Sequence, residues 1–220
     1  MDIKTSPCSF FVFDLDDTLF PEVDYLKSAY RHIATRLKPV IGEDIYDEMF
    51  RRYQQKENVF KWVAGLKNGS AEPVTTDWLL AEYRGHVPAV ALAEATKAFI
   101  DAVKRLAVRT GLITDGRSIT QRNKLKALGI DNFFNDIIIS EEFGSEKPDE
   151  RNYLFFQQKY PGSEFYFFGD NTSKDFIVPA KLGWTTVCLK DTGNHIHKQA
   201  FDKQPLPDYI ISTFSEINLY

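Results

Sequence analysis

The sequence predicts an α/β fold with a doubly wound, mainly parallel sheet and an inserted α-helical domain. Two observations support this fold class. Short apolar runs alternate with helical patterns over most of the chain, whereas one long segment near the start has helical periodicity alone. With 220 residues, 43% of them hydrophobic and 26% charged, the chain can form one core domain with a modest insertion.

Six apolar runs are typical of buried strands, because they are short and rich in aromatic and β-branched residues. Helical patterns separate the later runs, as expected for parallel βαβ units. One helix is indicated by a capping box of Ser118 and Gln121 and by Gly129 at its end. A second is expected to begin near Pro148. The predicted strands are residues 10–13, 108–113, 137–139, 165–168, 184–189 and 209–211.

The segment from residue 20 to residue 88 is predicted to be a bundle of helices. Its apolar residues recur at intervals of three and four, from Leu26, Tyr30 and Ile33 onward, and it contains no convincing strand. We therefore predict a core domain made of residues 1–19 and 89–220, with residues 20–88 inserted as a helical cap domain.

The charge and cysteine content narrow the range of partners. A net charge of -4 gives no general attraction to nucleic acid polymers or anionic membranes. The two cysteines form no zinc spacing or disulfide framework, and no apolar run is long enough to span a membrane. We expect a cytoplasmic protein that binds neither nucleic acid nor membrane, and a homodimer is left open.

Polar segments follow the predicted strands near the point where each ends. "DLDDT" follows the first strand, "TDG" the second and "GDNTSKD" the fourth, while "EKPD" lies a little beyond the third. Because ligands of open α/β sheets bind outside the carboxyl ends of the strands, these segments should meet in one crevice. The side chains expected there are Asp14, Asp16, Thr114, Lys147, Asp170 and Asp175.

Carboxylates dominate this predicted crevice. Asp14 and Asp16 are two residues apart, so on an extended backbone their side chains point to the same side. Two unit charges ~4 Å apart repel by about 4 kcal/mol at an effective dielectric near ~20. With Asp170 added, the repulsion favours a divalent cation, and oxygen ligands suit Mg²⁺ rather than zinc. Asp17 should face the other way and is predicted to have a structural or helix-capping role.

A hard cation, a lysine and a carboxylate nucleophile are together the components of phosphoryl transfer. An aspartate can accept a phosphoryl group, and a second acid two residues on could transfer protons to the leaving group and from water. The metal and Lys147 would neutralise charge on the transferring oxygens. The remaining phosphate oxygens have candidate partners in the hydroxyl of Thr114 and the backbone N–H groups of Asp115 and Gly116.

Taken together, these segments resemble the motifs of the haloacid dehalogenase-like (HAD) hydrolase superfamily. "DLDDT" matches the first motif, DxDxT, and Thr114 in "ITDG" matches the second. Lys147 in "EKPD" matches the third, and "GDNTSKD" is similar to the acidic fourth. The resemblance covers residues 10 to 19 and about 90 to 212, and four motifs in order are far more specific than one aspartate pair.

The resemblance implies roles for four of these residues in the chemistry. Asp14 would be the nucleophile and a metal ligand. Asp16 would be the general acid/base and would also give its backbone carbonyl to Mg²⁺. Thr114 and Lys147 would hold the phosphoryl group, and Lys147 would also orient Asp14.

The resemblance also implies how the acidic fourth motif contributes to the metal site. Asp170 would complete the metal shell, and Asp175 would bind the metal indirectly or orient a ligand. Asp175 also fits a capping box with Thr172, which is a compatible structural role.

The carboxylate at position 16 indicates which family chemistry to expect. True dehalogenases lack it, since displacing a halide needs no leaving-group acid. The resemblance implies a Mg²⁺-dependent phosphatase with a cap, acting through an aspartyl phosphate on a small metabolite such as a nucleoside monophosphate, a sugar phosphate or phosphoglycolate. Two alternatives stay open at this point: a phosphomutase with the same chemistry, and a non-catalytic protein that binds a phosphorylated ligand.

Overall fold

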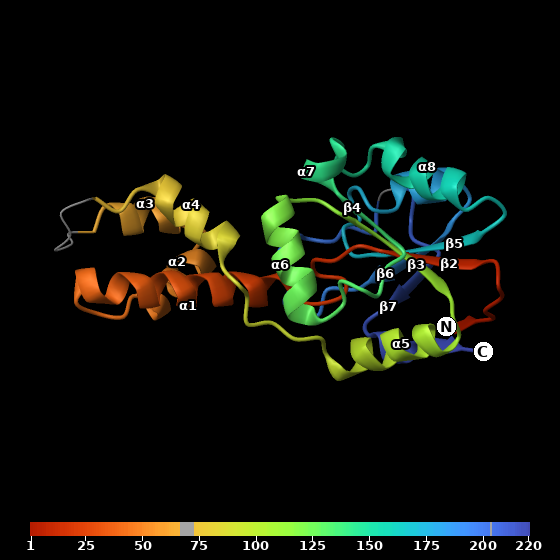
Figure 1. The fold of residues 1–220 in the computed structure, drawn as a ribbon, viewed down its shortest axis with the longest axis horizontal. Helices are drawn as coiled ribbons and strands as arrows, with labels where there is room; N and C mark the ends of the chain where they lie inside the picture. Colours follow the sequence, from red (N-terminus) through yellow and green to blue (C-terminus); the bar gives the residue numbers. More distant parts are fainter. Residues whose placement is uncertain (67–72, 203) are drawn as a thin grey trace. The chain divides into compact units, whose positions relative to one another are not determined.

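The computed structural model describes residues 1–66, 73–202 and 204–220 (Figure 1). Residues 67–72, which belong to the predicted insertion, and residue 203 lie outside this description. The chain divides into two compact units. The core unit comprises residues 1–23 and 91–220, and the helical unit comprises residues 24–90.

A six-stranded sheet in which every neighbouring pair is parallel forms the centre of the core unit. The strand order is β4-β3-β2-β5-β6-β7, so the order reverses beside β2, as in doubly wound folds. The predicted α/β fold class and all six predicted strands are confirmed. A second sheet, of β1 (Asp2–Ile3) and β8 (Asn218–Leu219), was not predicted. The main strands are β2 (Ser9–Phe13), β3 (Arg109–Thr114), β4 (Asp136–Ile139), β5 (Glu164–Gly169), β6 (Thr185–Leu189) and β7 (Tyr209–Ile211).

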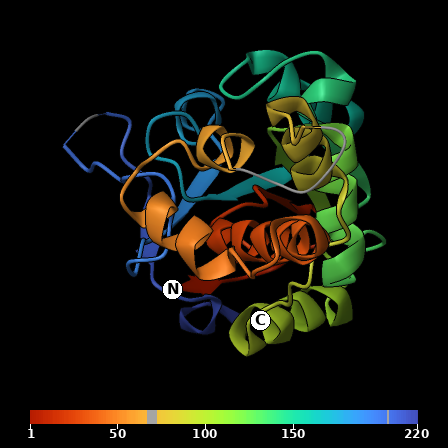
Figure 2. The ribbon, with the colours of Figure 1, turned by 90° about the vertical axis from the view of Figure 1, so that its left-hand side faces the viewer.

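Helices cover both faces of this sheet, which explains why β2 is apolar at consecutive positions. Figure 1 shows α5 and α8 on opposite sides of the strands, and Figure 2 shows the same layers from the side. The 3₁₀ helix η1 packs with α5. The helices of the core unit are α5 (Glu94–Arg105), α6 (Ser118–Leu128), α7 (Ser140–Phe143), α8 (Glu150–Lys159), α9 (Ile177–Lys181) and η1 (Phe214–Glu216).

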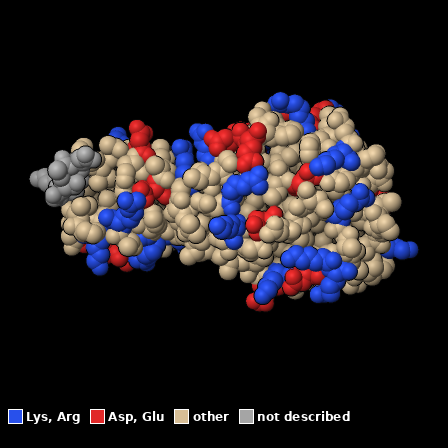
Figure 3. All heavy atoms as spheres, viewed as in Figure 1, with Lys and Arg blue, Asp and Glu red and all other residues tan. Residues whose placement is uncertain are grey.

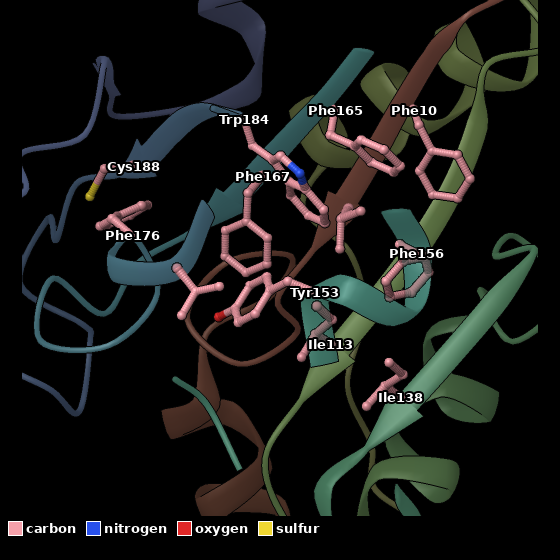
Figure 4. Packing of buried hydrophobic residues seen from close by; sticks show 12 residues of the cluster. Phe10, Ile113, Ile138, Tyr153, Phe156, Phe165, Phe167, Phe176, Trp184 and Cys188 are labelled. Carbon is pink, nitrogen blue, oxygen red and sulfur yellow. The ribbon is translucent and has the colours of Figure 1, made fainter. Parts of the chain in front are cut away.

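Successive residues of β2 belong to two different aromatic cores. Phe10 and Val12 point to one face, where they join a buried cluster that includes Phe156 of α8 (Figure 4). On the other face the ring of Phe11 stacks on Phe99 of α5, with centroids 6.3 Å apart. Both cores are buried, and the alternation fixes the register of the central strand, because a slip by one residue would exchange the two faces.

Of the two predicted helix starts, the one near Pro148 is confirmed and the capping box at Ser118 is not. Arg117 is the N-cap of α6 and Ser118 is its first residue, so Ser118 and Gln121 form no capping box. The backbone N–H of Ser118 instead donates to Oε2 of Glu141, at 2.7 Å. Pro148 precedes α8, whose N-cap is Asp149. The start of α6 is thus set by a tertiary contact with Glu141, whereas α8 begins with a local cap in which the Asp149 side chain accepts the N–H of Arg151. Gly129 is the left-handed C-cap of α6, as predicted.

The helical unit consists of packed amphipathic helices, and α1 starts in the core unit at Glu22. The apolar positions that repeat at helical spacing in the sequence are the ones buried within it, including Ile33 and Met49. The helices are α1 (Glu22–Ile41), α2 (Tyr46–Gln54), α3 (Val59–Ala64) and α4 (Thr76–Gly85).

The surface of the described residues carries charges of both signs. On the face shown in Figure 3, Lys and Arg side chains alternate with Asp and Glu side chains. Among the described residues no helix is both long enough and apolar enough to cross a bilayer.

Gly111 of β3 provides a test of the packing between the sheet and α8. A Cβ atom at this position would lie 2.3 Å from Cε1 of the buried Phe156 ring. We therefore expect Gly111→Ala to lower the free energy of unfolding by about 1–3 kcal/mol, because the clash outweighs the entropic benefit of replacing glycine in a strand. Urea denaturation would measure the change.

Gly65→Ala is the matched control, since a Cβ at Gly65 would meet its nearest atoms at 3.5 Å, an ordinary contact. A Gly111→Ala protein as stable as the wild type would show that the sheet and α8 do not pack this closely.

Candidate active site

Asp14 is positioned by the two strands that flank β2. Its backbone N–H donates to the carbonyl of Phe168 at 2.8 Å, and Phe13 pairs in register with both Leu112 of β3 and Phe168 of β5. The nucleophile candidate therefore lies at the carboxyl end of the sheet, where the strand order reverses and where open α/β folds bind ligands.

A buried ion cluster joins three of the residues predicted from the sequence. Nζ of Lys147 lies 2.6 Å from Oδ1 of Asp14 and 2.8 Å from Oδ1 of Asp175. The Lys147 side chain is only 2% exposed. One ammonium group thus bridges the first and fourth motifs from the loop that precedes α8.

Asp175 is held by the turn that follows β5. Its Oδ2 accepts the backbone N–H groups of Asp170, at 3.1 Å, and of Asn171, at 2.9 Å. A Cβ on Gly169 would lie 2.6 Å from that same oxygen, so glycine is required there. Thr172 does not form the alternative capping box, because its hydroxyl accepts the N–H of Ala200.

Carboxylate oxygens of Asp14, Asp170 and Asp175 lie within 4.8 Å of one another, and all three residues are buried. Oδ2 of Asp170 accepts no hydrogen bond from the described residues, although Nδ1 of His195 is 3.4 Å away. Three buried carboxylates with one shared lysine leave an excess of negative charge. This donor set of hard oxygens fits a divalent cation such as Mg²⁺.

The pKa shifts of Asp14 and Lys147 also indicate that the cluster has an excess of negative charge. Burial raises the pKa of Asp14 well above its ordinary value, Asp175 and Asp170 raise it further, and Lys147 opposes the shift. Burial alone would lower the pKa of Lys147, but the neighbouring carboxylates outweigh it and raise that pKa. Since a nucleophile must be ionised, Asp14 needs more positive charge than Lys147 alone provides.

Of the three predicted phosphate-binding residues at the end of β3, the structure places two in the same pocket as Asp14. Thr114 and Asp115 line it, and the carboxylate of Asp115 lies 2.5 Å from Nζ of Lys174. Gly116 requires a correction. Its N–H donates to Oγ of Ser140, at 2.9 Å, because the β3–α6 turn is tied to the start of α7. This N–H is therefore not available to a phosphate.

Asp16 lines the same pocket, and both of its carboxylate oxygens are bound by α6. Nζ of Lys124 lies 2.6 Å from Oδ1, and Nε2 of Gln121 donates to Oδ2 at 3.0 Å. Nε2 of Gln121 also donates to the hydroxyl of Thr114, at 2.6 Å. The sequence analysis missed both partners, although two buried polar residues three positions apart on a core helix are an unusual pattern.

Asp17 has the structural role that the sequence predicted. Its Oδ1 accepts the N–H of Glu22, the first residue of α1, and its Oδ2 accepts the N–H of Ile196. Its backbone is left-handed, with φ of 56°.

Residues 195–197 lie in a loop after β6, where Ile196 and His197 are exposed and His195 is partly buried. The side chain of His195 is only 11% exposed and lies beside Asp170, while His197 lines the pocket. The pocket has a volume of about 120 Å³, and it is also lined by Glu22, Asn171 and Lys174, which the sequence analysis did not select.

Residues 11–189 match the family described as haloacid dehalogenase-like hydrolase. The chain belongs to this family. In this haloacid dehalogenase-like hydrolase, Asp14, Thr114, Lys147 and Asp170, one from each of the four segments, line one pocket.

Several known proteins resemble this haloacid dehalogenase-like hydrolase over nearly its full length. It is 25% identical over 226 residues to a glyceraldehyde 3-phosphate phosphatase of Methanopyrus kandleri, covering 94% of each chain. It is 27% identical over 222 residues to a glyceraldehyde 3-phosphate phosphatase of Methanocaldococcus jannaschii, covering 94% of this chain and 93% of that protein. The family and both relatives agree with the predicted enzyme class, phosphoric monoester hydrolase.

A solved structure shows the same fold. The HAD-hydrolase YfnB of Bacillus subtilis, in a crystal structure bound to magnesium, matches with a TM-score of 0.60 and 17% identity. The match covers 94% of this chain and 96% of that chain.

Glu22 of the pocket gives a prediction about pH. Burial, with the nearby charge of Asp16, raises its pKa from an ordinary 4.5 to about 8. A carboxyl with a raised folded-state pKa contributes stability below its unfolded pKa and loses it as the pH rises through the folded value. Glu22→Gln removes this titration, so its stability relative to wild type should increase between about pH 5 and pH 8, by roughly 1 kcal/mol or more.

Urea denaturation over this pH range, in the presence of a chelator, measures the difference. Glu43→Gln is a control at an exposed position. A stability difference between Glu22→Gln and wild type that does not vary with pH would contradict the prediction.

Proposed function

We propose that this protein is a Mg²⁺-dependent phosphatase that hydrolyses a small phosphorylated metabolite through an aspartyl phosphate on Asp14. The observation that carries the proposal is the ion cluster in which Lys147 lies 2.6 Å from Asp14, with Asp16 in the same pocket. The reaction requires the protein to supply a nucleophile, a fixed positive charge and a second carboxyl group, and these three residues supply them.

Asp14, Asp170 and Asp175 are the residues whose side chains would hold Mg²⁺ or orient its ligands. The backbone carbonyl of Asp16 is the further ligand that the family resemblance implies. When bound, the ion would supply positive charge that keeps Asp14 ionised and neutralises the phosphate oxygens.

In the first step, a carboxylate oxygen of Asp14 attacks phosphorus, and the bond from phosphorus to the leaving oxygen breaks. Asp16 donates its proton to that oxygen, so the alcohol leaves as a neutral molecule. Lys147 and the hydroxyl of Thr114 stabilise the oxygens of the transferring group.

In the second step, Asp16 removes a proton from a water molecule, which attacks phosphorus and breaks the bond to Asp14. Inorganic phosphate is released, Asp14 is regenerated as a carboxylate, and Asp16 is again protonated. The two half-reactions thus return every chain residue to its starting state.

Sugar phosphates of the size of glyceraldehyde 3-phosphate are the proposed substrate class, because both relatives described above are named glyceraldehyde 3-phosphate phosphatases. The pocket is lined by Thr114, Lys147 and Lys174, which suit the oxygens of a phosphoryl group. We assign selection of the substituent to the helical unit, in the role of a cap. Free Cys8 and Cys188 support a cytoplasmic location for the enzyme.

Asp14→Asn is the direct test of the nucleophile. The amide cannot form the acyl phosphate, so phosphate release should fall on the order of 10³-fold or more. Asp131→Asn, at an exposed position of the core unit, should leave the rate unchanged. Full activity of Asp14→Asn toward a monoester cleaved by the wild type would refute the mechanism.

Substrate class and metal dependence can be tested with one assay of released phosphate. We expect glyceraldehyde 3-phosphate to be cleaved faster than nucleoside monophosphates or phosphoglycolate, and we expect a chelator to abolish release and Mg²⁺ to restore it. A sugar bisphosphate that is isomerised without free phosphate would identify a phosphomutase instead. Absence of turnover over the whole panel would favour a binding protein.

A further inference from the structure

Lys124 of α6 is a buried cation that the proposed chemistry leaves without a function. Its residue is 2% exposed, and its ammonium group lies 2.6 Å from Oδ1 of Asp16. Asp16 is itself largely buried, with 18% of its side chain exposed. The pair is distinct from the one that Lys147 makes with Asp14 and Asp175.

Burying an ammonium group is costly, because the penalty for removing it from water can exceed the gain from pairing it with a carboxylate. Lysine is rarely this buried unless it is paired. Lys126, two residues further along α6, is exposed, as is usual for lysine on a helix. Lys124 therefore lies on the buried side of α6, where its ammonium group is paired with Asp16.

A second donor from the same helix completes the arrangement around Asp16. Gln121 is 1% exposed, lies one turn before Lys124 and donates one hydrogen bond to Oδ2 of Asp16 and another to Oγ1 of Thr114. Because Gly116 has no side chain, it leaves room for Gln121: a Cβ atom at position 116 would lie 3.2 Å from Cδ of Gln121, closer than an ordinary contact. Both oxygens of Asp16 are thus fixed from α6.

We propose that Lys124, assisted by Gln121, is a positioning residue for the acid/base carboxyl group of Asp16. This inference rests on the proposed phosphatase function. Lys124 contacts Asp16, which lines the pocket that holds Asp14, so its proposed action on the reaction is through Asp16. Its ammonium group holds the carboxyl group of Asp16, which lines the same pocket as Asp14, and proton transfer depends strongly on such placement.

The effect of a Lys124 variant on kcat/KM for different leaving groups distinguishes a residue that positions the acid from one with a general structural role. An aryl phosphate such as 4-nitrophenyl phosphate releases a stable anion and needs little protonation, whereas an alkyl phosphate such as glycerol phosphate needs a proton on its leaving oxygen. The ratio kcat/KM reports steps up to formation of the aspartyl phosphate and excludes its later hydrolysis.

We expect Lys124→Met to lower kcat/KM by roughly 10²-fold for the alkyl phosphate and by less than about tenfold for the aryl phosphate. Asp16→Asn should show the same selectivity to a greater extent. Lys124→Arg, which keeps the charge, should recover most of the alkyl phosphate activity. Lys126→Met is the matched control on the same helix and should resemble the wild type.

A double-mutant cycle provides the decisive measurement. In an Asp16→Asn background, Lys124→Met should change kcat/KM for the alkyl phosphate little further, because a positioning residue has nothing left to position. If Lys124→Met does not fold, as judged by thermal unfolding, Gln121→Met tests the same selectivity while the buried charge pair remains.

Two results would overturn the positioning role while the wild type remains an active phosphatase. One is that Lys124→Met lowers kcat/KM equally for the alkyl and the aryl phosphate. The other is that the effect of Lys124→Met on kcat/KM adds fully to that of Asp16→Asn. Absence of phosphate release from both substrate classes by the wild type would overturn the proposed function as well. The two failures are therefore distinguishable.

Discussion

One buried ammonium group shared by buried carboxylates is the constraint on which the rest of the core unit depends. Lys147 contacts Asp14 and Asp175, and Asp170 lies within the same cluster of acidic oxygens. Such charges are tolerated in a protein interior only when their geometry is held closely. The glycine before Asp170, the backbone donors to Asp175 and the pairing of β2 with both neighbouring strands provide that geometry.

The aromatic cores on the two sides of the sheet keep this cluster in place. Phe10 and Phe11 belong to opposite faces, so β2 cannot shift along its neighbours without exposing one core and disrupting the other. Because Asp14 directly follows β2, the packing that holds this strand also fixes the position of Asp14. The arrangement of side chains at the carboxyl end of the sheet thus depends on hydrophobic packing as well as on ion pairs.

The sequence predicted the strands and the helical insertion because their hydrophobic periodicity reflects which side chains are buried, as in β2 and in the helices of the helical unit. Helix starts were less predictable: Ser118 fits a capping box, yet its N–H donates to Glu141, more than twenty residues later. Gly116 shows the same limit, since Ser140 takes its N–H. The buried roles of Lys124 and Gln121 depend on how α6 lies against Asp16, and a single sequence does not contain that information.

Asp17 joins two segments that are far apart in the sequence. One of its oxygens receives the N–H that starts α1, and the other receives an N–H from the loop that carries His195. Asparagine tolerates the same left-handed backbone, but its side chain offers one accepting oxygen in place of two, and longer acids do not favour that conformation. Only aspartate therefore combines this backbone conformation with two accepting oxygens, so a single carboxylate at position 17 ties the start of α1 to the loop of His195.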